Sequence, residues 1–387
     1  MKWPTLCSFL IFGCQAISGA HGLVDPLKPT SNIDTMTFGP ALEVVHEFHQ
    51  QMPTGVAVST KGRVFVSYPR WTNDVRYSVA EIINGKEIPY PSLSMHPETS
   101  EIQSANVTHK SFKNFIVSAQ TIELDGQDRL WIVDTGSVFR GKTVKGGSKL
   151  ICFDLRTNKV VKSIIFSDPV IHDISYINDA RFDLSRGYAY ITDSSSRPGL
   201  IIVNLKTMKA WRKLNEHPFT LATDKFVPIV EGVPIQPITN GVYGHMDVGS
   251  DGISLNADGT RLFWCPLSSR LLFSVDTKLL TDPNLQDTDL EKSVTQHGDK
   301  GGGADGLEID SKDRLYMTNY EHNSINRFYA DTGRIEPFVR DPRNIWPDTM
   351  HVTDGYLYWI ANQINRESGI RPFYMFRVPI DAKRVLL

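Results

Sequence analysis

Four aspartates occupy equivalent positions of a repeated sequence pattern. The pattern occurs six times, and its second residue is Thr54, Gln120, Asp179, Asp251, Asp305 or Asp348. If the repeats surround one axis, the acidic side chains face one another and raise each other's pKa. Such a ring requires a compensating cation, shared protons or a polar ligand. Bound calcium is one solution, and shared protons would instead support general acid–base chemistry.

Each copy of the pattern is typical of two strands joined by a polar turn. The stretches "GADGLEIDSKDRLYMTN" (303–319) and "AQTIELDGQDRLWIVDT" (119–135) alternate apolar and polar residues in this way. Repeats of about 40–50 residues or more, each with several short strands, are typical of a β-propeller. The sequence therefore predicts an all-β fold, a six-bladed β-propeller, that occupies residues 21–387 as a single domain.

The propeller geometry places the candidate site at one mouth of the central channel. The first strand of each copy lines the channel, and the second strand runs back antiparallel to it. The loops after the second strands should therefore surround the ring of first positions, and function on propellers normally lies on such loops. Five of these loops begin at Tyr68, Asp134, Asp193, Asn319 and Asn362.

Other residues near this mouth have more than one interpretation. Arg70, in "YPRW", can bind an anion, stack on an aromatic ligand or tie down its own loop. His245, in "GHMDVGSDG", lies on the approach to the channel, and a solvated surface position is its alternative. An Asp before a Gly can also simply form a turn. The same alternatives hold for His297 and His322.

Composition and short motifs argue against several other classes of function. The net charge is −2, so we expect no nucleic-acid partner. The stretch "GDKGGGADG" lacks the strand–loop–helix context and the Ser or Thr of a phosphate-binding loop. No GxSxG or HExxH motif appears, and "DSSSR" has no recognisable base partner.

The N-terminus "MKWPTLCSFLIFGCQAISGA" predicts a secretory signal peptide over residues 1–20. Its apolar run is too short for a membrane span, so the mature chain is expected to be secreted or to lie in the lumen of the secretory pathway. Asn106, in "NVTH", is a predicted glycosylation site. Cys152 and Cys265 can form a disulfide or remain two buried thiols.

Five motifs, in order along the chain, resemble a known family. They include "VFVSYPRW", "RLWIVDTG" and "DGISLNADGTRLFWCPLSSRLLFSV". They look like the repeat motifs of the yellow / major royal jelly protein family. The resemblance implies a six-bladed propeller, secretion and a pocket for small aromatic molecules at one channel mouth. Members of that family include dopachrome-converting enzymes of melanin formation and binders of biogenic amines.

A more distant resemblance is to the gluconolactonase / regucalcin propellers, which hold a divalent metal on the axis. The stretch "NDARFD" matches that family's motif at Asn178 and Asp179, and "ADG" matches it at Asp305. This resemblance implies Asn178, Asp251 and Asp305 as metal ligands. Thr54 replaces the family's Glu and Asp251 replaces an Asn, and both departures argue against the metal and against lactonase chemistry.

The chain length and the short signal are also similar to fungal pathway proteins of this propeller type, among them hetero-Diels–Alderases. The first hypothesis is therefore a cofactor-free cyclase or isomerase. It would join a tropolone-type quinone methide to a humulene-type polyene, and acids in the ring would help water to leave. Proximity would supply most of the rate gain. The alternatives are dopachrome tautomerisation and non-catalytic binding of aromatic amines or phenols.

These hypotheses share one set of predicted site residues, with an aromatic or terpenoid small molecule as the partner. The predicted catalytic residues are Arg70, Asp179, His245, Asp251 and Asp305. The predicted ligand-binding residues are Thr54, Tyr68, Trp71, Gln120, Asn178, Trp264, Asn319, Tyr320, Trp346 and Asp348. No cofactor is required, and calcium on the axis is an alternative.

Overall fold

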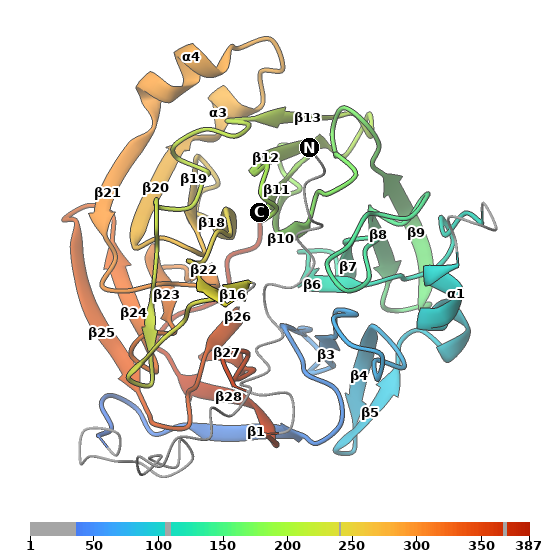
Figure 1. Ribbon diagram of the computed structural model, residues 1–387, viewed down its shortest axis with the longest axis horizontal. Helices are drawn as coiled ribbons and strands as arrows, with labels where there is room; N and C mark the ends of the chain where they lie inside the picture. The colour runs from blue at the N-terminus through green and yellow to red at the C-terminus, as the bar shows by residue number, and fades with distance from the viewer. Residues whose placement is uncertain (1–35, 105–109, 240, 367–369) are drawn as a thin grey trace.

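Six four-stranded antiparallel sheets surround a central channel (Figure 1). This computed structural model describes residues 36–104, 110–239, 241–366 and 370–387. The predicted all-β, six-bladed propeller is confirmed. The predicted signal peptide and Asn106 lie outside the described residues. Within the described ranges, no helix is long and apolar enough to cross a membrane.

The first five blades each follow the chain from the channel outward. The first blade consists of β2 (Gly55–Val58), β3 (Val64–Ser67), β4 (Val79–Ile83) and β5 (Lys86–Pro89), and the second of β6 (Ala119–Leu124), β7 (Arg129–Asp134), β8 (Lys149–Asp154) and β9 (Lys159–Ile165). The third consists of β10 (Ile177–Asp183), β11 (Tyr188–Asp193), β12 (Gly199–Asn204) and β13 (Ala210–Lys213), and the fourth of β18 (Ser250–Leu255), β19 (Arg261–Pro266), β20 (Leu271–Asp276) and β21 (Thr295–Asp299). The fifth consists of β22 (Leu307–Ile309), β23 (Arg314–Asn319), β24 (Ser324–Tyr329) and β25 (Arg334–Arg340).

The sixth blade joins the two ends of the chain. Strands β26 (Pro347–Thr353), β27 (Tyr356–Ala361) and β28 (Phe373–Pro379) are completed by the N-terminal strand β1 (Glu43–Phe48), which pairs antiparallel with β28. Figure 1 shows this pairing as blue beside red. Because strands from both ends share one sheet, the ring of blades is closed by backbone hydrogen bonds.

Short helices and hairpins connect the blades. The helices are η2 (Leu93–Met95), α1 (Thr99–Gln103), α3 (Thr277–Leu280), α4 (Asp287–Leu290) and η3 (Glu291–Ser293). Between the third and fourth blades lie two small hairpins, β14 (Ile229–Val230) with β15 (Val233–Pro234) and β16 (Ile238–Thr239) with β17 (Val242–Tyr243). Phe226 and Met246 flank these hairpins and belong to one buried cluster with Tyr320 and Trp346.

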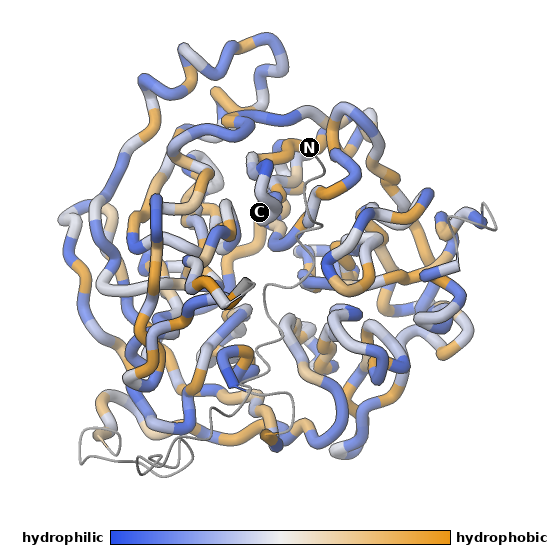
Figure 2. The backbone as a smooth tube through the Cα atoms, in the orientation of Figure 1, coloured by the Kyte–Doolittle hydropathy of each residue, from blue (hydrophilic) through white to orange (hydrophobic). Residues whose placement is uncertain are grey.

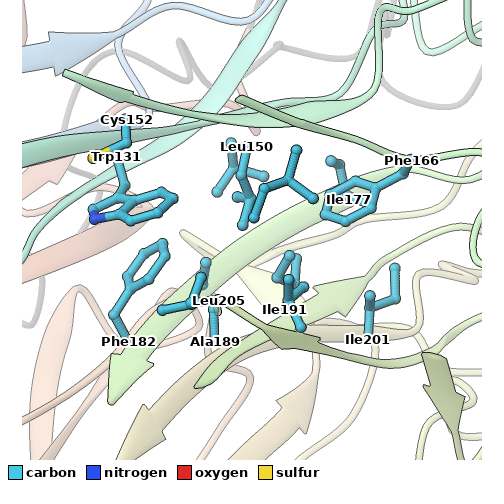
Figure 3. Close-up of a cluster of buried hydrophobic side chains, with 14 of the residues drawn as sticks. Trp131, Leu150, Cys152, Phe166, Ile177, Phe182, Ala189, Ile191, Ile201 and Leu205 are labelled. Carbon is cyan, nitrogen blue, oxygen red and sulfur yellow. The ribbon is translucent and has the colours of Figure 1, made fainter. Parts of the chain in front are cut away.

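The hydrophobic core lies between neighbouring blades. In the cluster between the second and third blades, Trp131 stacks on Phe182 at 4.6 Å, beside Cys152 (Figure 3). Along the strands of Figure 2, apolar stretches are interspersed with polar ones, as expected where strand faces alternate between environments. Cys152 and Cys265 are buried free thiols in separate clusters, so the structure shows the second of the two predicted alternatives.

Glycines after the ring positions allow the innermost strands to approach closely. A Cβ added at Gly252 would overlap the carbonyl oxygen of Asp305 in the next blade, and one at Gly306 would lie 2.5 Å from that of Asp348. Neither glycine has a positive φ. The recurring Asp-Gly therefore reflects contact between blades and not a tight turn.

We expect Gly252→Ala to destabilise the protein by about 1–3 kcal/mol, because the added methyl group pushes against the neighbouring backbone. Gly126→Ala is the matched control, since its Cβ would meet only the Leu386 side chain at 3.5 Å. Urea unfolding of both variants measures the difference. Equal free energies of unfolding would contradict the close-approach explanation.

The C-terminal segment 380–387 covers the far end of the channel, where the innermost strands finish. The main-chain oxygen of Leu387 accepts from the Leu184 amide after β10. The Arg384 side chain donates to the main-chain oxygen of Leu124 and to Glu123 Oε1 at 3.2 Å. The backbone of Arg384 also forms an isolated antiparallel β-bridge with the backbone of Asp310, which follows β22. Three blades thus contact the segment, and in Figure 1 the C-terminus lies close to the centre.

Candidate functional site

The opposite mouth, where the innermost strands begin, opens into a cavity of about 210 Å³. Several predicted site residues from around the ring line this cavity: Trp71, Gln120, Asn178, Asp251, Asp305, Trp346 and Asp348. These residues are far apart in the sequence, and the circular arrangement of the six blades brings them together.

Three carboxyl groups lie together at this cavity. The carboxyl group of Asp305 lies close enough to those of Asp251 and Asp348 to interact with both. Trp346 Nε1 donates to Asp305 Oδ2 at 2.8 Å, and Asn362 Nδ2 donates to Asp348 Oδ2 at 2.7 Å. Two carboxyl groups can hydrogen-bond to each other only if a proton lies between them. Because the three groups are buried close together, the cluster retains protons.

Burial is the main cause of the pKa shifts of this acid cluster (Asp251, Asp305 and Asp348). It raises the pKa of Asp305 to about 6. Burial and the neighbouring Asp305 raise the pKa values of Asp251 and Asp348 well above the usual range. Near neutral pH the acid cluster therefore offers both a protonated carboxyl group and an ionised one.

Asp179, the fourth acid of the ring, is compensated by a cation. Arg181 Nη1 donates to Asp179 Oδ1 at 3.1 Å. Arg181 also lies 3.2 Å from Glu308 and 3.7 Å from Glu123, and Arg384 lies 3.2 Å from Glu123. Burial raises the pKa of Glu308 to about 8. Two guanidinium groups and one retained proton neutralise these three carboxyl groups.

One wall of the cavity is a chain of aromatic and polar side chains. Trp71 Nε1 donates to the Tyr176 hydroxyl at 2.7 Å, and that hydroxyl donates to Gln120 Oε1 at 2.6 Å. The Arg140 guanidinium lies 4.1 Å from the Trp71 ring centroid and 5.8 Å from that of Tyr176. This geometry is typical of a cation–π contact.

Sequence reasoning missed Arg140 and Tyr176. Tyr176 directly precedes the third repeat, and Arg140 follows the motif "DTGS" in a mouth loop. For Arg140, the sequence feature that could have indicated a site role is its position in a loop at the channel mouth. Lys142, Asp247 and the serines of "DSSSR" also line the cavity.

The structure does not place Arg70 at the cavity, although we predicted it to be catalytic. Arg70 is fully buried and donates to the main-chain oxygens of Val117, at 2.8 Å, and of Val75. It also donates to Thr99 Oγ1 at 3.0 Å. These contacts match the interpretation that Arg70 ties down its own loop.

Several other predicted residues also lie outside the cavity lining. The Tyr68 hydroxyl donates to Glu87 at 2.7 Å, and Trp264 Nε1 donates to the main-chain oxygen of Phe219 at 2.8 Å. Both rings pack within the blades because their side chains point away from the channel. His245 is exposed beside β17 and does not line the cavity.

The remaining predicted residues lie outside the cavity lining and contact neighbouring main-chain oxygens or a lining residue. Thr54 Oγ1 donates to the main-chain oxygen of Gln120 at 2.6 Å, and Asn319 Nδ2 donates to that of Gly301 at 2.8 Å. Tyr320 stacks on Trp346 with centroids 4.3 Å apart, and its hydroxyl donates to the main-chain oxygen of Leu267. Tyr320 therefore fixes the ring of a lining residue.

The predicted metal ligands each have other neighbours in this structure. In the part of the chain that the structure describes, no group of three or more His, Cys, Asp or Glu side chains is arranged to hold a metal. Asn178 Nδ2 donates to Ser194 Oγ at 2.7 Å, and Asp305 Oδ2 accepts from Trp346 Nε1 at 2.8 Å. We therefore derive no chemical step through calcium.

With this geometry established, comparison with known proteins identifies the class. The sequence profile of the Major royal jelly protein family matches residues 117–372, which is more than half of the chain. The protein therefore belongs to the major royal jelly protein family.

Named relatives agree with this assignment. Protein yellow of Drosophila erecta is 25% identical over 240 residues, which cover 60% of this chain and 42% of the relative. Major royal jelly protein 3 of Apis mellifera is 24% identical over 243 residues, covering 61% of this chain and 41% of the relative. The matched region thus spans about two fifths of these relatives' lengths.

Solved structures share the fold at low sequence identity. Regucalcin from Agrobacterium tumefaciens, a calcium-binding protein, has a TM-score of 0.54 and 13% identity over 90% of this chain and 97% of its own. A gluconolactonase from Xanthomonas campestris has a TM-score of 0.51 and 10% identity over 87% of this chain and 89% of its own. These similarities concern the propeller fold alone.

Proposed function

We propose that the protein binds one small quinonoid molecule in the channel cavity and isomerises it by proton transfer. The reaction would be the dopachrome-type tautomerisation that the resemblance to the yellow / major royal jelly protein family implies. The observation that supports the proposal is the acid cluster, whose three closely spaced, buried carboxyl groups line the cavity and retain protons. Such a cluster supplies a general acid and a general base at adjacent positions.

The proposed reaction needs no net proton, electron or cofactor. An ionised carboxyl group of the acid cluster takes a proton from a ring carbon of the quinonoid molecule. The electron pair of that C–H bond moves into the ring, and the quinone oxygen accepts a proton from a neighbouring protonated carboxyl group. Product release leaves the cluster with the same number of protons. Trp71 and Trp346 provide flat surfaces against which the ring can be held.

The size and polarity of the cavity favour this reaction over a cycloaddition. Pockets for drug-sized ligands typically measure about 300–1,000 Å³, and this cavity measures about 210 Å³. That volume fits one small ring system better than a quinone methide together with a terpenoid polyene. An apolar polyene would also bind poorly here, because it would displace water from the carboxyl groups without hydrogen-bonding to them. The hetero-Diels–Alder reaction is therefore the less favoured candidate.

Incubation of the purified protein with freshly prepared dopachrome tests the proposal. We expect the loss of the orange colour to accelerate in proportion to protein concentration, with a dihydroxyindole as the product. Heat-denatured protein and buffer alone are the controls. A rate equal to that in buffer, together with calorimetric binding of phenols or aromatic amines, would contradict the tautomerase and favour non-catalytic binding.

Entry into the secretory pathway is also part of the proposal. It rests on the apolar N-terminal sequence of residues 1–20.

A further inference from the structure

Arg140 is a cation at the cavity whose guanidinium has no hydrogen-bond or ion-pair partner among the described residues. The residue is half-buried. Lys142, the other cation of the lining, forms an ion pair with Asp173 at 2.7 Å. The Arg140 donors are therefore available to a ligand, whereas the Lys142 ammonium already has a carboxylate partner.

The Arg140 guanidinium lies against two aromatic rings. Its contacts are with the ring of Trp71 at 4.1 Å and that of Tyr176 at 5.8 Å. The hydrogen bonds from Trp71 to Tyr176 and from Tyr176 to Gln120 fix these rings. A guanidinium is planar, and its N–H groups form a fork that matches the two oxygens of a carboxylate.

The backbone around Arg140 has an unusual conformation. Phe139 and Arg140 both have a φ of 53°, in the left-handed region. Non-glycine residues in that region cost free energy and persist only where surrounding contacts enforce them. Here the Phe139 amide donates to the main-chain oxygen of Arg70 at 2.8 Å, so the buried Arg70 loop holds the Arg140 loop in place.

The charges that face Arg140 set the orientation of a ligand. Asp251, Asp305 and Asp348 line the same cavity and act electrostatically on Arg140, without contacting it within hydrogen-bond distance. Their shared protons reduce, but do not remove, the repulsion of an anion. A ligand carboxylate is therefore best placed at Arg140, with the ring extending toward the acid cluster.

We propose that Arg140 binds the carboxylate of the substrate, so that the cavity selects a planar aromatic or quinonoid ring that carries a carboxylate over the decarboxylated analogue. This inference rests on the proposed function only in so far as the bound ring is also the group that reacts. The recognition itself is a binding property that can be measured without turnover.

Calorimetric titration with indole-2-carboxylate and with indole tests the inference on the full-length mature protein. We expect the wild type to bind the carboxylate about 10–100-fold more tightly, the range expected for a hydrogen-bonded charge pair. Arg140→Gln should lose this preference and bind indole as the wild type does. Arg140→Lys should keep only part of the preference for the carboxylate, because an ammonium cannot donate two parallel hydrogen bonds to it as a guanidinium does.

Arg156→Gln is the control for the loss of one positive charge, since the Arg156 side chain is 82% exposed at the far end of the second blade. It should bind both ligands as the wild type does. Equal wild-type affinities for the two ligands, or no binding of either, would overturn the inference. So would an Arg140→Gln variant with native circular dichroism that keeps the preference.

The wild-type comparison decides even if the variants fail to fold. A preference for the carboxylate without any dopachrome turnover would contradict the tautomerase alone. Turnover of dopachrome without the preference would contradict the role of Arg140 alone.

Discussion

Asp305→Asn is expected to lower kcat for quinonoid isomerisation by about 10²–10⁴-fold, the range that general acid–base groups supply. Asp305 is the central member of the acid cluster, since it interacts with both Asp251 and Asp348. Asparagine has nearly the same shape and can still accept the hydrogen bond from Trp346 Nε1. The substitution therefore removes proton exchange and leaves the packing in place. Steady-state kinetics with dopachrome measures the effect.

The matched control is Asp289→Asn, because Asp289 lies on the exposed helix α4. It makes the same chemical change away from the channel, and its kcat should equal that of the wild type. A kcat for Asp305→Asn equal to that of this control would show that the acid cluster takes no part in the reaction.

The same variant has an expected signature in stability. The pKa of Asp305 is raised in the folded protein, to about 6. Its contribution to folding stability is therefore fully present below the pKa of the unfolded chain and is lost as the pH rises through about 6. In Asp305→Asn this loss should disappear, so urea unfolding should show a smaller decrease in stability across that range. An unchanged pH dependence would show that Asp305 ionises normally.

Arg181→Met is expected to destabilise the protein by about 3–5 kcal/mol, because it leaves buried carboxyl groups without their cation. Arg181 contacts Asp179 at 3.1 Å, Glu308 at 3.2 Å and Glu123 at 3.7 Å. Methionine is of similar length, so the loss of charge dominates over the loss of volume. Urea unfolding near neutral pH measures the change in free energy.

Arg186→Met is the control, since the Arg186 side chain is 41% exposed and pairs with Asp183 on a turn. A partly exposed pair of this kind contributes less than about 1 kcal/mol. The cost of Arg181→Met should also shrink at low pH, where the three carboxyl groups become neutral. Equal effects of the two substitutions would contradict a role for Arg181 as the compensating cation of the channel.

The fold and the ring of polar positions could be predicted because both depend on the repeat. A fixed interval between strand starts and strand ends is enough to place Asp251, Asp305 and Asp348 at one mouth. The pattern does not show which way a side chain points within its loop. Arg70 lies in a mouth loop, as predicted, but its guanidinium turns inward to main-chain oxygens.

Other features depend on contacts between blades, which a single repeat does not show. Trp264 lies on the second strand of its blade and packs against Phe273, at 5.8 Å, away from the channel. Arg140 and Tyr176 lie outside the repeated pattern, and only the fold brings them together over Trp71. The glycines after Asp251 and Asp305 resembled a turn signal, but the structure shows that they allow close approach of the neighbouring backbone.

Infrared titration of protein labelled with ¹³C in the aspartate carboxyl groups tests the shared protons most directly. The account predicts that the C=O band of a protonated aspartate is present near neutral pH and weakens as the pH rises above about 6. The band should be weaker in Asp305→Asn. Complete ionisation of every aspartate well below that pH would contradict the shared protons, and with them the proposed acid–base chemistry.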